Sequence, residues 1–293
     1  MLKPNLSSYN LMGDILKKIF EYIGLLSLAC FSFFYTSKIS TVIKDTDNIY
    51  KQIKEVQEQY KVEAIDAKIE NDTIIPGLKG SEIDIEQSYK KMKKINSFND
   101  NLLVYKDIKP NISIKNNYNK YVISGNKNKR QVALMFLVKE SDNINYILNL
   151  LEENEINVTF YIDSIWLDNN NELISKIISL GHNIGTLNGY NENSTEWMNS
   201  ILKKTFNQKH TYCYSENKNE QILKICSSKK SYTIIPNIII SNNPLIEIKQ
   251  KITNGSIVSL NLSNTTEKEL PLIIEYLNSK DLEIVNIEKL LEE

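Results

Sequence analysis

The stretch LISKIISLGHNIGTLNGYN, residues 173–191, carries the pattern that decides the fold. Apolar residues at helical spacing run up to Leu180, and Gly181 then stops the helix, because glycine readily adopts the backbone conformation that ends helices. The residues NIGTL that follow are typical of a short buried strand. The stretch also contains His182, one of only 2 histidines in the chain. It therefore has the outline of a metal-binding loop, and the residues around it must decide whether His182 is a ligand.

On both sides of this stretch, helical and strand-like segments alternate from Gln131 to Glu293. The strand-like segments include QVALMFL, VTFYI, SYTII, GSIVSL and LEIVNI. Strands that alternate with helices predict an α/β domain with parallel strands, and strands this apolar favour the interior of a barrel. The roughly 160 residues are too few for an eight-fold barrel. We therefore expect an incomplete (β/α) barrel over residues 131–293.

An apolar run precedes this domain at residues 19–37, IFEYIGLLSLACFSFFYTS, with Glu21 as its one charged residue. Its length is at the lower end for a membrane span, and Lys17 and Lys18 stand directly before it. We expect a transmembrane anchor, with residues 1–18 cytoplasmic and the rest exported, as in a single-pass protein of the cell membrane with an extracytoplasmic domain. A cleaved signal peptide fits less well, because the end of the run lacks the small-x-small pattern of a cleavage site.

A heptad-like seam follows the apolar run. Its members step by three and four residues and are Ile39, Val42, Thr46, Ile49, Ile53, Val56 and Tyr60. This spacing predicts a helical stalk over residues 38–63. The stalk could pair with a second copy as a coiled-coil homodimer, or lie as a lone helix on the following domain. For residues 64–130 we expect a small connecting α+β segment without a core of its own.

Composition excludes some functions. The chain has 35 Lys and Arg against 36 Asp and Glu, and this balance argues against a nucleic-acid partner. It has 3 cysteines and no CxxC pair, which argues against structural zinc. Cys213 and Cys226 could form a disulfide in an extracytoplasmic domain, but we favour the interpretation of two separate buried side chains.

The carboxyl ends of the expected strands are where a barrel places its reacting groups. These positions hold Asp163 as their one aspartate and no histidine. Asp163 could bind a cation, although its place between a strand and a helix favours a helix cap.

Several segments resemble the polysaccharide deacetylase (NodB homology) family in order and spacing. They are VALMF, ILNLLEENEINVTFYI, LISKIISLGHNIGTLNGYN, GSIVSLN and LEIVNIEKLL, and they cover about residues 131–293. The resemblance implies the family's half-barrel fold and its chemistry, the metal-dependent removal of acetyl groups from N-acetylated sugars. In such chemistry a divalent ion polarises the amide and its water, while a carboxylate and an imidazole move protons.

The resemblance also places the family's catalytic and metal positions on residues that lack the chemistry. The base aspartate falls on Leu137, the metal aspartate on Val138, the two metal histidines on Leu187 and Asn191, the motif arginine near Thr211 and the late histidine on Asn261. Leucine and valine offer no lone pairs to a metal, and no proton carrier replaces the lost groups. We therefore expect a pseudoenzyme without cofactor or metal, in which His182 falls on a scaffold position of the family.

Two functions follow from the resemblance. The first is a non-catalytic protein that binds cell-wall glycan, or that acts as a scaffold for another envelope protein. The second is a divergent deacetylase that uses Asp163 and Asn191 with a weakly held ion. The residues expected to line a pocket or contact a ligand, with the aromatic ones as a sugar-stacking platform, are Asp163, Asn188, Tyr190, Tyr212 and Tyr214.

Overall fold

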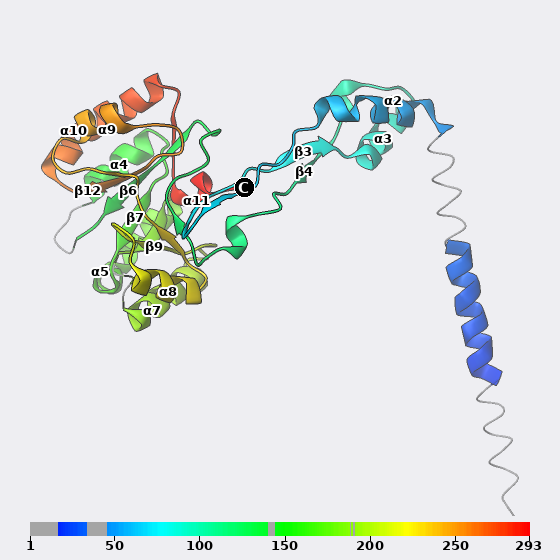
Figure 1. Ribbon diagram of the computed structural model, residues 1–293, viewed down its shortest axis with the longest axis horizontal. Helices are drawn as coiled ribbons and strands as arrows, with labels where there is room; N and C mark the ends of the chain where they lie inside the picture. The colour runs from blue at the N-terminus through cyan, green and yellow to red at the C-terminus, as the bar shows by residue number, and fades with distance from the viewer. Residues whose placement is uncertain (1–16, 34–45, 140–143, 188, 190) are drawn as a thin grey trace, which may run out of the picture. The chain divides into compact units, whose positions relative to one another are not determined.

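The computed structural model describes residues 17–33, 46–139, 144–187, 189 and 191–293 (Figure 1). The chain forms two compact units. The first, which we call the helical unit, combines the described residues up to Val62 with Ser81–Asp107, and the second, the barrel unit, combines Glu63–Gly80 with Ile108–Glu293.

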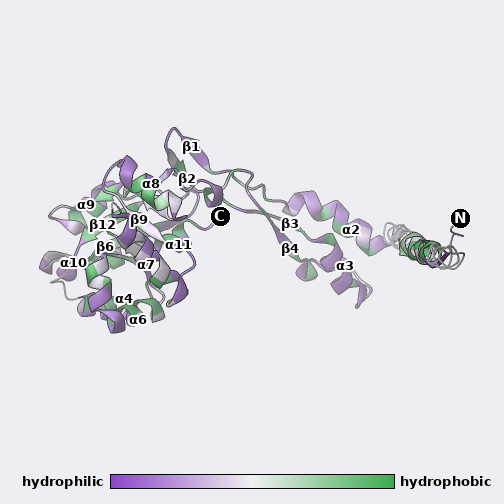
Figure 2. Cartoon of the chain, turned by 90° about the horizontal axis from the view of Figure 1, so that it is seen from below, coloured by the Kyte–Doolittle hydropathy of each residue, from purple (hydrophilic) through white to green (hydrophobic). Residues whose placement is uncertain are grey.

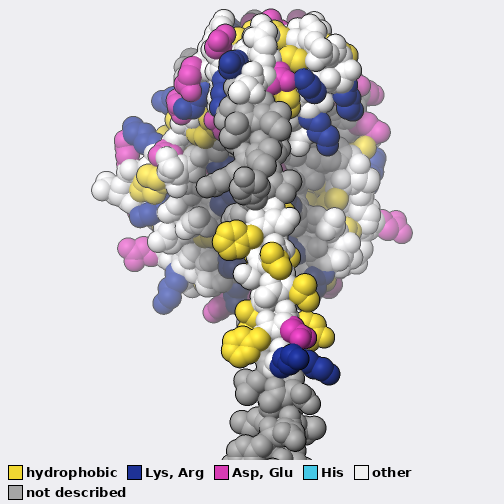
Figure 3. Space-filling view, turned by 90° about the vertical axis from the view of Figure 1, so that its right-hand side faces the viewer, with side chains coloured by type: hydrophobic (Ala, Val, Ile, Leu, Met, Phe, Trp, Pro, Cys, Tyr) yellow, Lys and Arg dark blue, Asp and Glu magenta, His cyan; other side chains and the backbone are white. Residues whose placement is uncertain are grey.

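Residues 17–33 form a helix whose side chains are exposed throughout. Figure 3 shows hydrophobic side chains on its surface, with charged side chains at one end. Among the residues described, no helix combines the length and the apolar character needed to cross a membrane. The predicted cytoplasmic segment up to residue 16, the end of the predicted anchor and the first part of the predicted stalk, residues 34–45, lie outside the described residues.

The helical unit contains the described part of the heptad seam. Its elements are α2 (Asn48–Gln57), the 3-10 helices η1 (Glu58–Tyr60) and η2 (Asp100–Leu102), β3 (Gly80–Ile83), α3 (Ile85–Lys93) and β4 (Tyr105–Ile108). Ile49 and Ile53 are buried in one cluster with Ile83 and Met92. The seam from Ile49 onward therefore packs within the chain, and the α-helix ends at Gln57, short of the predicted stalk end at residue 63.

The barrel unit is built on one large sheet. Its strands are β1 (Lys68–Glu70), β2 (Thr73–Ile75), β5 (Tyr121–Val122), β6 (Gln131–Leu137), β7 (Thr159–Ile162), β8 (Asn183–Thr186), β9 (Tyr212–Tyr214), β10 (Tyr232–Ile234), β11 (Ile238–Ile239), β12 (Ile257–Asn261) and β13 (Glu283–Val285). The order is β1-β2-β5-β10-β9-β8-β7-β6-β12-β11, and β13 pairs with β6 off this path. Apart from the antiparallel β1–β2 pair, the neighbouring strands described in this sheet pair in parallel. The expected α/β half-barrel is present.

The predicted boundaries of the connecting segment, residues 64–130, are wrong. Strands β1, β2 and β5 belong to the sheet of the barrel unit, whereas residues 81–107 pack with α2 around a core of their own. The physical reason is that short strands without a periodic pattern gain their order from pairing with a sheet already present, which local sequence does not reveal.

The two faces of the sheet bury different clusters, because side chains alternate along each strand. On β6, Val132, Leu134 and Phe136 belong to an outer cluster with the helices, while Ala133 and Met135 belong to an inner cluster. The helices of this unit are α4 (Asn145–Glu153), α5 (Ser164–Asn169), α6 (Asn171–Ser179), α7 (Glu192–Lys204), α8 (Glu220–Ser228), α9 (Pro244–Lys251), α10 (Asn264–Ser279) and α11 (Ile287–Leu290), with a 3-10 turn η3 (Ile114–Asn116). The helices mix hydrophobic with hydrophilic residues, as expected for elements with one buried face (Figure 2).

The amino ends of the strands are closed by the end of the described chain. Strand β13 pairs with the first half of β6, and the backbone N–H of Ile287 donates to Oγ1 of Thr159 over 2.9 Å. Ile287 and Leu290 of α11 lie in the inner cluster. The end of the chain thus adds apolar side chains to the inner cluster near the amino ends of the strands.

Candidate functional site

The carboxyl ends of β6, β7 and β12 bring together two of the predicted catalytic positions. Leu137 pairs with Asn261 on one side and with Tyr161 on the other. Leu137 is half-buried and packs on the inner cluster, whereas Asn261 is exposed. The predicted base position thus contributes an apolar contact, and the predicted late histidine position contributes an amide at the surface.

The two predicted metal-histidine positions follow β8. Leu187 is half-buried and packs on the same inner cluster as Leu137. Asn191 is the N-cap of α7, and its side chain accepts a hydrogen bond from the backbone N–H of Ser194 over 3.0 Å. The first residue is thus part of the core, and the second satisfies a helix terminus.

Val138 and Thr211 lie away from these residues. Val138 is 1 % exposed and belongs to the outer cluster, on the opposite face of the sheet from Leu137. Thr211 precedes β9, so it lies at the amino edge of the sheet, where its hydroxyl is 2.6 Å from that of Ser231. Thr211, the position that the resemblance places near the family's arginine, therefore lies at the edge of the sheet opposite to Leu137 and Asn261, because a residue before a parallel strand lies at the edge opposite to its carboxyl end.

Asp163 and Asn191 share a small pocket at the carboxyl edge. This pocket has a volume of about 220 Å³ and is lined by Asp163, Ser164, Ile165, Thr186, Asn191, Ser194 and Met198. The carboxylate of Asp163 accepts a hydrogen bond from the backbone N–H of Trp166 over 2.8 Å and thereby caps α5. The cap interpretation is confirmed, and the side chains of Asp163 and Asn191 are both engaged by helix termini.

Of the predicted aromatic platform, the described tyrosines Tyr212 and Tyr214 are buried instead of being displayed at the carboxyl edge. Tyr212 lies at the amino end of β9, and Tyr214 packs inside with its ring centroid 5.7 Å from that of Tyr161. Burial raises the pKa of the Tyr214 phenol, opposed by a hydrogen bond with Ser259, and burial also raises the pKa of Tyr161. These buried phenols are therefore neutral at ordinary pH. Asn188 and Tyr190 lie outside the described residues.

Gly185 explains how the ring of Tyr161 fits inside the half-barrel. A Cβ atom at position 185 would lie 2.3 Å from Cε1 of Tyr161. The two residues are direct partners on β7 and β8. Glycine is thus required here for close packing against an aromatic ring.

The residues at the carboxyl edge do not fit a metal ion. Within the described ranges, no group of three or more His, Cys, Asp or Glu side chains could hold one. Leucine and valine carry no donor atoms, and the amide of Asn191 already accepts a hydrogen bond. No reaction step that needs a metal can be derived for this edge.

His182 has a structural role. It is 3 % exposed, its Nδ1 accepts a hydrogen bond from the backbone N–H of Val158 over 3.2 Å, and its ring meets Phe160 edge-on at 5.4 Å. Burial lowers the pKa of His182 from 6.5 to about 4. The side chain lies before β8, away from the carboxyl edge.

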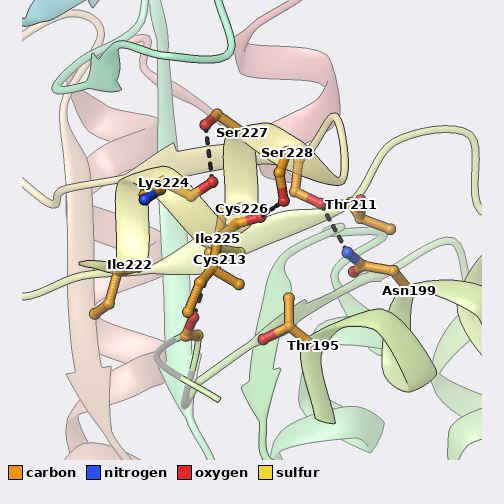
Figure 4. Close-up of a disulfide and its surroundings, with 12 residues drawn as sticks. Thr195, Asn199, Thr211, Cys213, Ile222, Lys224, Ile225, Cys226, Ser227 and Ser228 are labelled. Carbon is orange, nitrogen blue, oxygen red and sulfur yellow. Dashed lines mark hydrogen bonds between the residues drawn. A yellow bond between two sulfur atoms is a disulfide. The ribbon is translucent and has the colours of Figure 1, made fainter. Parts of the chain in front are cut away.

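A disulfide joins Cys213 of β9 to Cys226 of α8 (Figure 4). Both residues are fully buried with Ile222, and their Cα atoms are 6.4 Å apart. The favoured interpretation of two separate thiols is therefore wrong. Gly189, in the loop after β8, lies directly on this cluster, since a Cβ there would be 3.2 Å from Sγ of Cys226. The disulfide thus supports the loop that includes Leu187 and Asn191.

Sequence reasoning missed two buried polar groups beside the site. The hydroxyls of Tyr161 and Thr186 are buried and have no hydrogen-bond partner among the described residues. Their only signal in the sequence is position, because each lies near the end of a strand next to a predicted site residue.

The strand order and the carboxyl edge define a class: an α/β half-barrel of the deacetylase type, in which the predicted metal positions carry apolar or helix-capping residues. Residues 124–243 match the polysaccharide deacetylase family model. The chain therefore contains a polysaccharide deacetylase domain.

Comparisons with individual proteins agree with this fold. The chain is 25 % identical over 276 residues to the protein YlxY of Bacillus subtilis strain 168, and the match covers 86 % of this chain and 86 % of YlxY. The crystal structure of wild-type BA3943, a CE4 family pseudoenzyme from Bacillus anthracis, has a TM-score of 0.64 and 23 % identity and covers 85 % of this chain and 96 % of its own. A BA3943 mutant with restored enzymatic activity gives a TM-score of 0.65 with 22 % identity, covering 84 % of this chain and 99 % of its own.

Proposed function

We propose that this chain is a non-catalytic, membrane-anchored protein of the cell envelope whose polysaccharide deacetylase domain binds N-acetylated glycan of the cell wall. The observation that carries the proposal is the state of the predicted site: Leu137 and Leu187 pack on the inner cluster, and Val138 packs on the outer one. A deacetylase would need metal ligands and a base at these positions. Fold alone does not imply function, and here the chemistry is missing while the fold is intact.

The location outside the cytoplasm is supported by two features. Residues 17–33 form a helix with an exposed apolar surface that carries Lys17 and Lys18 at its start. The disulfide between Cys213 and Cys226 is the kind of bond that persists in oxidising compartments. A single-pass anchor over residues 19–37 with an extracytoplasmic barrel unit accounts for both.

A divergent deacetylase is the second candidate, and one observation favours it. Asp163 and Asn191 line the same pocket of about 220 Å³, as a surviving hydrolase would require. Against it, each of these side chains caps a helix, and the residues that line the pocket include no histidine.

Metal analysis and an acetate assay separate the two candidates. The full chain is purified in detergent, incubated with zinc, cobalt or nickel ions and then with chitooligosaccharide. We expect neither stoichiometric metal nor acetate release. Acetate release that is lost in Asp163→Ala would establish the hydrolase. The BA3943 mutant with restored enzymatic activity, assayed in parallel under the same conditions, serves as the positive control.

Glycan binding is tested by calorimetric titration of the same full chain with chitotetraose. Ile165 is 60 % exposed and lines the carboxyl-edge pocket, so Ile165→Arg should weaken binding about tenfold by obstructing the pocket. Ile246 is 55 % exposed on α9 and does not line that pocket, so Ile246→Arg is the matched control and should bind like the wild type. No heat at millimolar glycan would remove the glycan part of the proposal and leave the scaffold for an envelope protein.

A further inference from the structure

A second pocket lies at the amino edge of the half-barrel, at the opposite end of the strands from the predicted site. Its volume is about 350 Å³, which is large enough for a small ligand. The residues that matter for its chemistry are Lys115, Lys209, His210, Tyr212, Tyr232 and Glu288. They come from η3, from the starts of β9 and β10, and from α11.

Aromatic rings form one wall of this pocket. The ring of Tyr232 stacks with those of Tyr118 and Tyr212, at centroid distances of 4.7 and 6.2 Å. The imidazole of His210 lies 5.8 Å from Tyr232 and is half-exposed, so it is the outer member of the group. Burial lowers the pKa of His210, and the neutral ring offers one hydrogen-bond donor and one acceptor.

The charged groups around the pocket are unequally engaged. Glu292 pairs with Lys289 over 3.1 Å, and the carboxylate of Glu293 accepts hydrogen bonds from the backbone N–H groups of Gly77 and Ile114. Lys115 and Lys209 make no ion pair with any described residue. Cations without partners at a pocket favour an anionic ligand. Tyr212 and Tyr232 are only 1 % and 3 % exposed, so the half-exposed ring of His210 is the aromatic face that a ligand can reach.

One carboxylate remains at the pocket. An oxygen of Glu288 accepts a hydrogen bond from Nδ2 of Asn183 over 3.2 Å, so the group is held in a fixed orientation. A fixed carboxylate repels a second anion at short range but accepts hydrogen bonds from hydroxyl groups. The pocket therefore suits a ligand that has a flat apolar face, several hydroxyls and one negative charge away from Glu288.

We propose that the amino-edge pocket binds an acidic sugar ring, a pyranoside that carries a carboxylate. The ring lies against the aromatic wall at His210, its hydroxyls hydrogen-bond to Glu288 and the imidazole, and its carboxylate lies between Lys115 and Lys209. This site is separate from the carboxyl-edge pocket, since the two share no lining residue.

The test uses calorimetric titration of the full chain in detergent with two matched probes. The first is the methyl glycoside of N-acetylmuramic acid, and the second is the methyl glycoside of N-acetylglucosamine, which lacks the carboxylate. We expect the acidic sugar to bind at least about tenfold more tightly. Equal affinities, or no heat with the acidic sugar up to millimolar concentration, would overturn the proposal. Inorganic phosphate that binds as tightly as the acidic sugar would also overturn it, because the pocket would then be a simple anion site.

Variants locate the binding. The double variant Lys115→Gln with Lys209→Gln should bind the acidic sugar about tenfold more weakly. The matched control is the double variant Lys224→Gln with Lys268→Gln, which removes the same charge from two exposed positions outside the pocket and should leave this affinity unchanged. His210→Ala should weaken binding of both sugars. Ile165→Arg at the carboxyl edge should leave this binding intact, so that failure here and failure of the proposed function are distinguishable. An unchanged affinity in the Lys115 and Lys209 double variant would contradict the assignment.

Discussion

The two ends of the half-barrel are closed by different kinds of side chain. At the carboxyl edge, Leu137 and Leu187 pack on the inner cluster, and the polar groups of Asp163 and Asn191 serve as helix caps. At the amino edge, polar and charged side chains gather around an aromatic group and line a larger pocket. In barrels of this type the carboxyl edge normally carries the chemistry and the amino edge the stability. Here the apolar filling of the carboxyl edge makes it a region of packing, and the open polar groups lie at the amino edge.

Removing the disulfide should have the largest effect on the free energy of unfolding, because the bond supports the loop at the carboxyl edge. Replacing Cys213 and Cys226 by Ala should lower the free energy of unfolding of the barrel unit by about 3 kcal/mol, mainly by restoring chain entropy to the unfolded state. Tryptophan fluorescence in urea reports this unit selectively, since Trp166 and Trp197 are the 2 tryptophans of the chain and both lie in it. Cys30→Ala, which alters an exposed free cysteine, is the control and should leave the transition unchanged. Equal stability of the double variant and the wild type would mean that the bond does not hold the loop.

A substitution at Gly185 tests how closely the inner face of the sheet is packed against the ring of Tyr161. Gly185→Ala should destabilise the barrel unit by about 2 kcal/mol, because the added Cβ would lie 2.3 Å from the ring of Tyr161. Adding Tyr161→Ala to this variant should remove the clash, so the two changes together should cost less than the sum of their separate effects. Strict additivity of the two substitutions in urea denaturation would show that position 185 is not limited by the ring.

Prediction from the sequence succeeded to different extents for the strands of the half-barrel and for its two edges. The alternation of helices and strands predicted the half-barrel. The pairing of Asn261 on β12 with Leu137 on β6 is an observation of the structure that the sequence analysis did not predict. Thr211, by contrast, lies before β9 at the amino edge of the sheet, a position that the order of the motifs alone did not indicate. The pairing of Cys213 with Cys226 depends on a distance across two elements that sequence spacing does not encode.

Strands β1, β2 and β5 show the same limit for the fold. They have two or three residues each and no periodic pattern, and they become strands by pairing with one another and with β10. The amino-edge pocket was likewise beyond prediction, because Lys115, His210 and Glu288 come from three distant segments that only the closed fold brings together.

The pH dependence of stability tests the amino side of the sheet. The pKa of His182 is lowered from 6.5 to about 4 by burial, so the unfolded chain takes up a proton near pH 6.5 while the folded chain does not. Stability is therefore complete above pH 6.5 and falls as the pH decreases toward 4, with a loss of about 1.4 kcal/mol between pH 7.5 and 5.5. His182→Asn keeps an acceptor for the N–H of Val158 and should remove most of this dependence in urea denaturation at the two pH values. A wild-type curve that is flat over this range would mean that His182 titrates normally.

The smallest expected effect on stability is that of substitutions at Asp163. These substitutions separate the two interpretations of its carboxylate, a helix cap and a cation ligand. If the carboxylate only caps α5, Asp163→Ala should cost about 1 kcal/mol, and Asp163→Asn should cost almost nothing because asparagine is an equally good N-cap. If the carboxylate instead holds a cation, Asp163→Asn would lose the charge that binds it and would lower the stability gained on adding divalent ions. Urea denaturation of the three proteins with and without zinc or calcium ions measures both differences. We expect Asp163→Asn to be as stable as the wild type under every condition, because the side chain at position 163 accepts the N–H of Trp166 and thereby caps the helix. This result would identify the carboxyl edge as a packed surface without chemistry of its own.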